Sequence, residues 1–125
     1  MAKILVADDN DVLRNALVMT LEQMGYDVEE APNGKVALDL QKKFLADVLL
    51  TDLIMPEKEG LEIIQEFRRR YPSVIIIAMS AGGRIHMKDL LKVAKQLGAN
   101  FALSKPFSND ELAETLNKAL VKQEA

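Results

Sequence analysis

Apolar residues of the chain fall into five short runs, and longer stretches with a helical spacing of apolar positions separate these runs. Three runs, at residues 3–8, 48–52 and 74–79, are rich in Val, Ile and Leu and are almost uninterrupted. Continuous apolar runs of this length are typical of parallel strands that are covered on both faces. Residues 26–31 and 101–104 are weaker runs, which we expect to form edge strands.

The stretches between these runs predict five amphipathic helices, because apolar residues recur in them every three or four positions. Gly25, Pro72 and Gly98 follow the first, third and fourth stretches and are suited to end a helix. The positions expected to face the core are Leu13, Ala16, Leu17, Met19, Leu21 and Met24 in the first helix, Val36, Ala37, Leu40 and Phe44 in the second, Leu61, Ile64, Phe67 and Tyr71 in the third, Met87, Leu90, Leu91, Ala94 and Leu97 in the fourth, and Leu112, Leu116, Ala119 and Leu120 in the fifth, with Met79 in a strand.

Polar residues mark the start of two helices and the end of another. Asp is a preferred N-cap residue, so we assign Asp11 as the cap of the first helix, with Asn10 as the competing candidate. Ser108 and Glu111 have the spacing of a capping box at the start of the fifth helix. Three arginines at 68–70 end the third helix, where cations complement the helix dipole.

Five strands that alternate strictly with five helices predict an α/β fold with a doubly wound parallel sheet. The 125 residues suit one domain, and no Pro-, Gly- or Ser-rich linker, repeat or low-complexity tract interrupts them. We therefore expect one domain over residues 1–125, with no room for an effector domain in this chain.

The composition narrows the classes of function. The net charge of −3 and the pI of about 5.2 argue against a surface for nucleic acid or an anionic membrane. The chain has no Cys, which excludes disulfides and thiol chemistry and fits a reducing cytoplasm. There is no signal-peptide pattern, and the longest apolar run, at residues 74–79, is too short to span a bilayer.

Polar residues stand at the carboxyl ends of four of the five predicted strands. Ligands bind beyond the carboxyl ends of the strands in open α/β sheets, so these residues are candidates for a site. A single Asp after a strand is usually a helix cap or turn residue, but the joint arrangement is hard to explain in that way. The candidates are Asp8 and Asp9 at the end of the first strand, Asp52 at the end of the third, Ser80 at the end of the fourth, and Lys105 with Pro106 at the end of the fifth.

Three carboxylates at one rim need a cation to offset their repulsion. Oxygen ligands without His or Cys favour a hard ion such as Mg²⁺. A carboxylate beside Mg²⁺ and the ammonium of Lys105 can attack phosphorus and form an aspartyl phosphate, while the hydroxyl of Ser80 can hydrogen-bond a phosphoryl oxygen. The nucleotide-binding motifs G-x-x-x-x-G-K-S/T and G-x-G-x-x-G after a strand are absent.

Short motifs occur in order at these strand ends: DD at 8–9, DLIMPEKEG at 52–60, which fits D-x-x-M-P-x-x-x-G, AMSA at 78–81, GAN at 98–100 and KPF at 105–107. Together they resemble the response-regulator receiver domain of two-component signalling, in a form similar to single-domain chemotaxis regulators. The resemblance spans the whole chain. It implies a flavodoxin-like sheet with the strand order 2-1-3-4-5.

The resemblance assigns the central role to Asp52, which would accept a phosphoryl group from the phosphohistidine of a sensor histidine kinase or a histidine phosphotransfer protein. Asp9 and Asp52 would ligate Mg²⁺ directly, and Asp8 would act through a metal-bound water. The backbone carbonyl of Ile54 would be a further ligand. The switched domain would then bind a downstream protein target.

The resemblance also implies roles around the phosphoryl group. Ser80 would bind a phosphoryl oxygen and shift on phosphorylation, and it is better placed for this than Ser104. Lys105 would pair with Asp52 first and with the phosphate afterwards. The peptide bond between Lys105 and Pro106 would be cis.

The sequence departs from the family at Ala102, where Tyr or Phe usually serves as an aromatic switch. Phe101 cannot replace it, because neighbouring side chains alternate faces along a strand. We therefore expect signalling through residues 80–92, in the connection after the fourth strand and the helix that follows. The single histidine, His86, lies in this connection, and we expect it to be solvated or to cap a helix. Ile54 has no side-chain hydrogen bond for a hydrolytic water, so we expect slow autodephosphorylation.

Two other functions stay open. A phosphatase with an aspartyl nucleophile needs an acid for turnover, usually an Asp two residues further on, and Ile54 occupies that place. A receiver-like adaptor would act by protein contacts without phosphorylation. We expect a phosphoacceptor switch that catalyses its own phosphorylation and dephosphorylation, and not an enzyme that acts on other substrates.

Overall fold

The computed structural model describes residues 2–53, 59–81 and 87–124, along which five strands and five helices alternate. The elements are β1 (Lys3–Ala7), α1 (Asp11–Gln23), β2 (Asp27–Ala31), α2 (Gly34–Phe44), β3 (Val48–Asp52), α3 (Glu59–Arg70), β4 (Ile75–Ala81), α4 (Met87–Leu97), β5 (Phe101–Lys105) and α5 (Asn109–Glu124). All strand pairs are parallel, and the sheet order is β2-β1-β3-β4-β5. This confirms the predicted doubly wound, flavodoxin-like fold.

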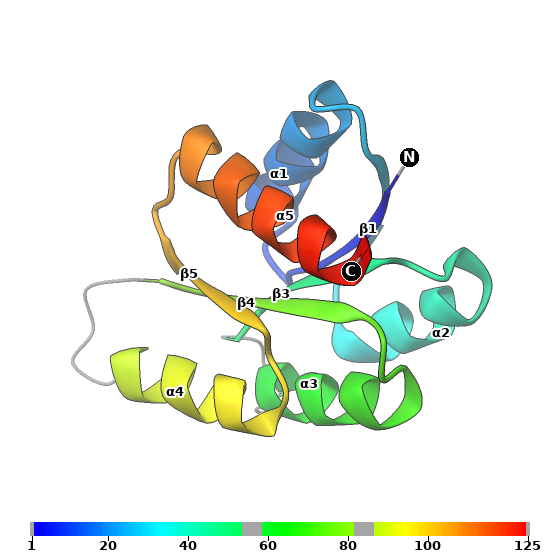
Figure 1. The fold of residues 1–125 in the computed structure, drawn as a ribbon, viewed down its shortest axis with the longest axis vertical. Coiled ribbons are helices and arrows are strands. Elements are labelled where there is room, and N and C mark those ends of the chain that lie inside the picture. The colour runs from blue at the N-terminus through cyan, green and yellow to red at the C-terminus, as the bar shows by residue number, and fades with distance from the viewer. Residues whose placement is uncertain (1, 54–58, 82–86, 125) are drawn as a thin grey trace.

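Two layers of helices cover the sheet. α1 and α5 lie on one face, and α2, α3 and α4 lie on the other (Figure 1). Every residue of β3 is buried, and the side chains of β1 and β4 alternate between the two hydrophobic clusters on the two faces. Burial on both faces explains why the apolar runs in these three strands are continuous.

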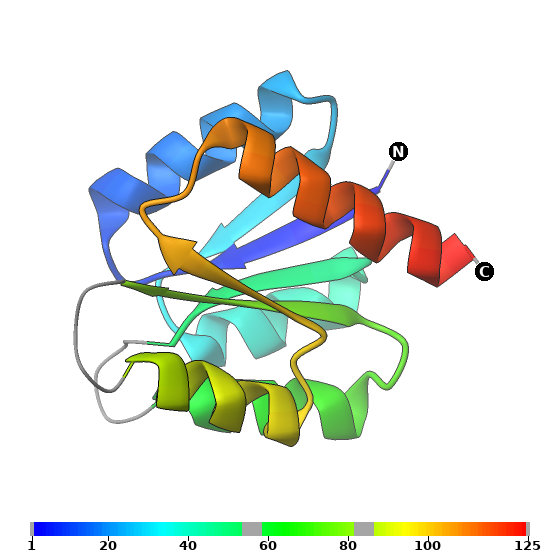
Figure 2. The same cartoon turned by 60° about the vertical axis from the view of Figure 1, so that its left-hand side comes forward.

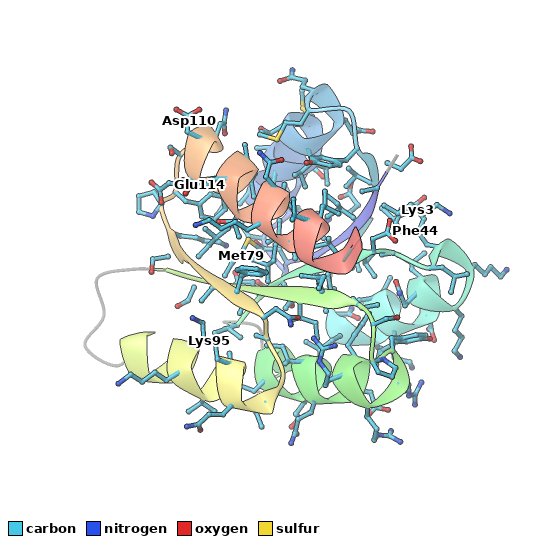
Figure 3. All side chains as sticks on the ribbon, viewed as in Figure 1. Lys3, Phe44, Met79, Lys95, Asp110 and Glu114 are labelled. Carbon is cyan, nitrogen blue, oxygen red and sulfur yellow. The ribbon has the colours of Figure 1, made fainter. Side chains whose placement is uncertain are left out.

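The predicted core faces of α2, α3 and α5 are confirmed, because each apolar residue predicted to face the core there is buried or packs against one of the clusters. Met79 is buried as predicted and lies in the cluster beneath α5 (Figure 3). In α4, Ala94 is buried and Leu97 is partly buried, whereas the side chains at 87–91 lie outside the described part of the structure. No helix in the described ranges is long and apolar enough to cross a membrane.

The predicted core face of α1 is wrong in part. Leu13 is 51% exposed and Met19 is 61% exposed, and Ala16 is exposed as well. Arg14 and Val18 are buried in their place. The helix takes this rotation because the guanidinium of Arg14 finds its hydrogen-bond partners beneath the helix, so a charged residue occupies an inward position.

The first helix cap also differs from the prediction. Asn10 is the N-cap of α1, and its side-chain oxygen accepts a hydrogen bond from an amide of the first turn at 3.1 Å. Asp11 is instead the first residue of the helix, where its carboxylate pairs with Arg14 at 2.7 Å. The capping box of α5 is confirmed, since the amide of Glu111 donates to the hydroxyl of Ser108 at 3.0 Å.

Glycines allow close approaches at two places. Gly98 follows α4 with a φ of 132°, a conformation that favours glycine, and so ends the helix as predicted. Near the start of α3, a Cβ at Gly60 would overlap the backbone of Leu53. Glycine therefore lets α3 begin directly against the residue that follows β3.

Candidate functional site

The carboxyl ends of the strands meet at one edge of the sheet, on the left in Figure 2. Asp52 is the last residue of β3, Lys105 is the last residue of β5, and Asp8 and Asp9 follow β1. Ser80 stands in β4 one residue beyond the ladder partner of Asp52. The fold therefore carries all five predicted side chains to the same edge.

The ammonium of Lys105 lies between two buried carboxylates. Its Nζ atom is 2.9 Å from Oδ2 of Asp52 and 3.0 Å from Oδ2 of Asp8. Burial by itself lowers the pKa of Lys105, but the hydrogen bonds to Asp52 and Asp8 outweigh burial and raise this pKa above its ordinary value of 10.5. The ammonium is therefore charged at neutral pH and ties together the ends of β1, β3 and β5.

Three carboxylates crowd this edge. Oxygen atoms of Asp8, Asp9 and Asp52 lie within 4.8 Å of one another. Like charges this close repel, and a cation among them would offset the repulsion. The oxygen donors and their spacing fit Mg²⁺, on which neighbouring ligand oxygens lie about 3 to 4 Å apart.

The three acids are held in different ways. Asp8 is buried, and while its Oδ2 contacts Lys105, its Oδ1 accepts a hydrogen bond from the amide of Asn10 at 2.9 Å. Asp9 is exposed, and its carboxylate has no hydrogen bond or ion pair with any residue that the structure describes. Asp9 thus keeps its whole carboxylate available to a metal ion. The backbone carbonyl of Ile54, expected as a further ligand, lies outside the described residues.

Ser80 is fully buried, and its hydroxyl has no hydrogen-bond partner within residues 2–53, 59–81 and 87–124. A buried hydroxyl without a partner is unfavourable by about 1 to 3 kcal/mol, so such groups usually have a ligand or water to bond. The alternative hydroxyl, Ser104, is exposed on β5. Burial therefore distinguishes the two serines in the way that the sequence indicates.

The end of β5 agrees with two expectations from the sequence. The peptide bond between Lys105 and Pro106 is cis. Phe101 packs in the hydrophobic cluster beneath α5 together with Leu103, so the side chain of Ala102 between them points to the α4 face. No aromatic side chain stands at this position on the α4 face. Residues 82–86, with His86, lie outside the described part of the chain.

Sequence reasoning missed Arg14, which lies behind the acidic edge. Arg14 is buried, and its Nη1 atom donates to the backbone carbonyl of Asp8 at 2.8 Å. Its Nε atom contacts Glu30 at 2.8 Å, and its Nη2 atom contacts Asp11 at 2.7 Å. Arg14 stands four residues before the buried Val18 and shares its face of α1, but apolar spacing assigned neither residue to the core.

The chain is similar to receiver-domain proteins over nearly all of its length. The model of the response regulator receiver domain matches residues 4–117. Sporulation initiation phosphotransferase F of Bacillus subtilis (strain 168) is 33% identical over 118 residues, which cover 94% of this chain and 93% of that protein. Sensor kinase CckA of Brucella abortus (strain 2308) is 32% identical over 126 residues, which cover 98% of this chain but 13% of the kinase.

Solved structures share the fold. Chemotaxis protein CheY4 of Vibrio cholerae matches with a TM-score of 0.85 and 32% identity, over 95% of this chain and 98% of that chain. A CheY-like receiver domain of Methanospirillum hungatei JF-1 matches with a TM-score of 0.90 over 99% and 97% of the two chains, and its 23% identity supports the fold alone. With its sheet order, its acidic edge and these matches, the chain belongs to the response regulator receiver domain family.

Proposed function

We propose that the domain is a phosphoacceptor switch in which Asp52 takes a phosphoryl group from the phosphohistidine of a sensor histidine kinase or a histidine phosphotransfer protein, with Mg²⁺ as cofactor. The observation that carries the proposal is the contact of 2.9 Å between Lys105 and the buried Asp52 inside a cluster of three carboxylates. An ion pair that served only stability would not need two further acids beside it. A relative named as a phosphotransferase and another named as a sensor kinase support a phosphorelay partner.

The transfer requires Asp52 to act as the nucleophile. An oxygen of its carboxylate attacks phosphorus, and the bond between phosphorus and the donor imidazole nitrogen breaks. The electron pair of that bond stays on the imidazole, which takes a proton from water, and Asp52 becomes an aspartyl phosphate. Asp9 and Asp52, with Asp8 in support, would hold Mg²⁺, which would supply positive charge to the phosphoryl group during transfer.

Two further residues stabilise the phosphorylated state in this proposal. The ammonium of Lys105 already lies beside Asp52 and is charged, so it can hydrogen-bond a phosphoryl oxygen without a change of protonation. The buried hydroxyl of Ser80 gains a partner when the phosphoryl group arrives. The Ser80 contact exists only in the phosphorylated form, so it favours that form over the free form, which is what a switch requires.

In this proposal the donor protein approaches the acidic edge across the rim between α1 and the residues that follow β5. A cavity of about 520 Å³ lies at this rim, and its lining includes Lys105, Leu13, Leu17 and Phe107. The exposed Leu13 adds apolar surface next to the charged site. We assign this rim to the approach of the donor.

The output surface in this proposal is the segment at 80–92. Ala102 has no ring to move with Ser80, so the usual coupling through an aromatic residue in β5 is not open to this chain. A shift of Ser80 would instead act on the segment directly attached to it, and a downstream protein target would bind there. Identical amide spectra of the free and phosphorylated protein across residues 80–92 would contradict this part of the proposal.

Intact mass spectrometry tests the proposed function. Protein incubated with Mg²⁺ and acetyl phosphate or phosphoramidate is expected to gain the mass of one phosphoryl group. Asp52→Ala is expected to abolish the adduct. Asp39→Ala is the matched control, because Asp39 is an exposed acid of α2 that lies 3.9 Å from Lys42 and does not belong to the cluster of three carboxylates, so this variant should keep the adduct.

The result separates the competing functions. A wild-type protein that takes no phosphoryl group would contradict the proposal and support an adaptor that acts by contacts alone. Continuous release of phosphate with turnover would support a phosphatase. An adduct that survives Asp52→Ala would show that another side chain is the acceptor.

A further inference from the structure

We propose that Arg14 is a positioning residue for the metal ligands, because its guanidinium fixes the peptide that joins Asp8 to Asp9 and thereby the direction in which Asp9 presents its carboxylate. The inference rests on the proposed function, in which Asp9 and Asp52 hold Mg²⁺. It adds a residue of α1 to the groups that determine metal affinity.

The backbone of Asp8 is held from both sides. Its amide donates to the carbonyl of Ala31 in β2 at 3.1 Å, which continues the sheet by one residue. Its carbonyl accepts a hydrogen bond from Nη1 of Arg14 at 2.8 Å. This carbonyl belongs to the same planar peptide as the amide of Asp9, so the contact with Arg14 fixes the plane from which Asp9 starts.

Asp9 depends on this plane more than the other two acids do. The carboxylates of Asp8 and Asp52 are buried and are held by Lys105 at 3.0 and 2.9 Å. The exposed carboxylate of Asp9 makes no hydrogen bond or ion pair with the described residues. Its position therefore follows from its backbone, and Arg14 is the side chain that anchors the peptide before it.

Neighbouring carboxylates balance the positive charge of Arg14. A cation close behind a metal site would oppose the binding of Mg²⁺. Arg14 pairs with Glu30 at 2.8 Å and with Asp11 at 2.7 Å, so two carboxylates surround one guanidinium. The planar guanidinium serves all three acceptors at once, which the single ammonium of lysine does not reproduce.

Arg68 offers a matched control at the other end of the sheet. Its guanidinium is partly buried and also holds backbone carbonyls, with contacts of 2.8 Å to Gly98, 2.7 Å to Pro72 and 2.9 Å to Val74. These carbonyls precede β4 and β5, at the edge opposite the acids. Loss of Arg68 therefore removes a comparable set of hydrogen bonds without touching the metal ligands.

The test measures Mg²⁺ affinity separately from stability. Amide chemical shifts recorded during a Mg²⁺ titration give the dissociation constant of the wild type, Arg14→Ala, Arg14→Lys and Arg68→Ala, and urea unfolding gives their stability. Loss of a residue that orients metal ligands typically weakens affinity by about 10- to 100-fold, so we expect at least about a tenfold rise in the dissociation constant for Arg14→Ala. Arg14→Lys should recover only part of the affinity, and Arg68→Ala should lose stability while keeping the wild-type constant.

Folded Arg14 variants with the wild-type dissociation constant would overturn the inference. So would an equal loss of Mg²⁺ affinity in Arg68→Ala, since the effect would then be a general consequence of lower stability. If Arg14→Ala does not fold, Arg14→Lys decides the question on the same criterion. A wild type that binds no Mg²⁺ would overturn the proposed function instead. In that case the ¹⁵N order parameter of the Asp9 amide tests the inference. The inference requires a lower order parameter in the Arg14 variants than in Arg68→Ala.

Discussion

At the amino-terminal edge of the sheet, Arg68 donates to three backbone carbonyls and to the side chain of Asn100, at distances between 2.6 and 3.1 Å. At the carboxyl edge, Arg14 donates to one carbonyl and to two carboxylates. Burial lowers the pKa of Arg68, whereas the hydrogen bond to Glu30 raises the pKa of Arg14 against the opposing effect of burial. At the amino-terminal edge, the acceptors around the guanidinium of Arg68 are uncharged. At the carboxyl edge, two carboxylates balance the charge of the guanidinium of Arg14.

The polar groups of the amino-terminal edge bond to one another. The Oδ1 atom of Asn100 accepts from Arg68 and also from the amide of Ile76. Asp47 accepts from the amide of Lys3 at 2.9 Å, and the Lys3 ammonium lies 5.6 Å from the centroid of the Phe44 ring (Figure 3). These contacts join loops to strand ends, so the edge has a structural role.

At the carboxyl edge, some polar groups are not satisfied by their neighbours. The hydroxyl of Ser80 is buried without a partner in the described structure, and three carboxylates lie within 4.8 Å of one another. Natural proteins keep such unfavourable arrangements mainly where a ligand resolves them. The contrast between the edges indicates that a polar cluster points to function when its groups remain unsatisfied, and to structure when they satisfy each other.

The largest effect on folding is expected from Arg68→Ala. This change takes the guanidinium away from partly buried carbonyls before β4 and β5, so we expect the free energy of unfolding to fall by about 3 kcal/mol. Urea unfolding measures the change. Arg69→Ala is the control, because Arg69 is exposed and pairs with Glu66 at the surface, so this variant should unfold at nearly the wild-type urea concentration. An equally small loss of unfolding free energy in Arg68→Ala would contradict the structural role of this edge.

A smaller effect, with a defined pH dependence, is expected from Lys105→Met. Without the ammonium, Asp8 and Asp52 lose their charged hydrogen-bond donor, so we expect a loss of about 2 kcal/mol near neutral pH. The raised pKa of Lys105 means that its contribution is complete below the ordinary value of 10.5 and disappears as pH rises through the folded-state value.

The measurement for Lys105 is the difference in unfolding free energy between the wild type and Lys105→Met across alkaline pH. The difference should be constant up to about pH 10 and shrink above it. Lys42→Met is the control, because Lys42 is exposed and lies 3.9 Å from Asp39, and this variant should differ little from the wild type at neutral pH. A difference that grows with pH would contradict the assigned direction.

The smallest effect, and one of opposite sign, is expected from Asp9→Asn. Removing one of three crowded charges should raise the free energy of unfolding by about 0.5 kcal/mol in the presence of a chelator. With excess Mg²⁺ the wild type should be the more stable of the two proteins, because metal binding stabilises the folded wild type. Thermal unfolding of the wild type and of Asp9→Asn, with chelator and with Mg²⁺, measures the two stability differences.

Asp110→Asn is the matched control for Asp9→Asn. Asp110 is an exposed acid in the first turn of α5 (Figure 3). Its charge complements the helix dipole, so its removal should lower stability slightly, with no dependence on Mg²⁺. A chelated Asp9→Asn protein that is less stable than the wild type would show that the crowded edge is not under electrostatic strain.

The fold was predictable because its signals are local and repeated. The runs that became β1, β3 and β4 are continuous because helices cover both faces of each strand, and the spacing in α2, α3 and α5 marks single buried faces. The candidate site was predictable for a related reason, since parallel strands bring their carboxyl ends to one edge. Asp8, Asp52 and Lys105 could therefore be grouped from positions far apart in the chain.

The orientation of α1 was not predictable by the same means. Apolar spacing placed Leu13 and Met19 inside, and both are exposed. The competing signal is Arg14, whose partners come from β2, the end of β1 and its own helix. The preference for Asp11 over Asn10 as the N-cap failed for the same reason, because Asp11 is engaged by Arg14.

The sequence by itself determined the element order, the strand order through its family motifs, and the set of side chains that gather at the carboxyl edge. Hydrophobic periodicity and strand-end residues carry this information, because they depend on neighbours along the chain. The tertiary structure alone decided that Lys105 contacts Asp8 as well as Asp52, that Ser80 is left without a partner among the described residues, and that Arg14 turns inward. These features depend on distances between separate elements, and a charged side chain reveals its role only when its partners are in place.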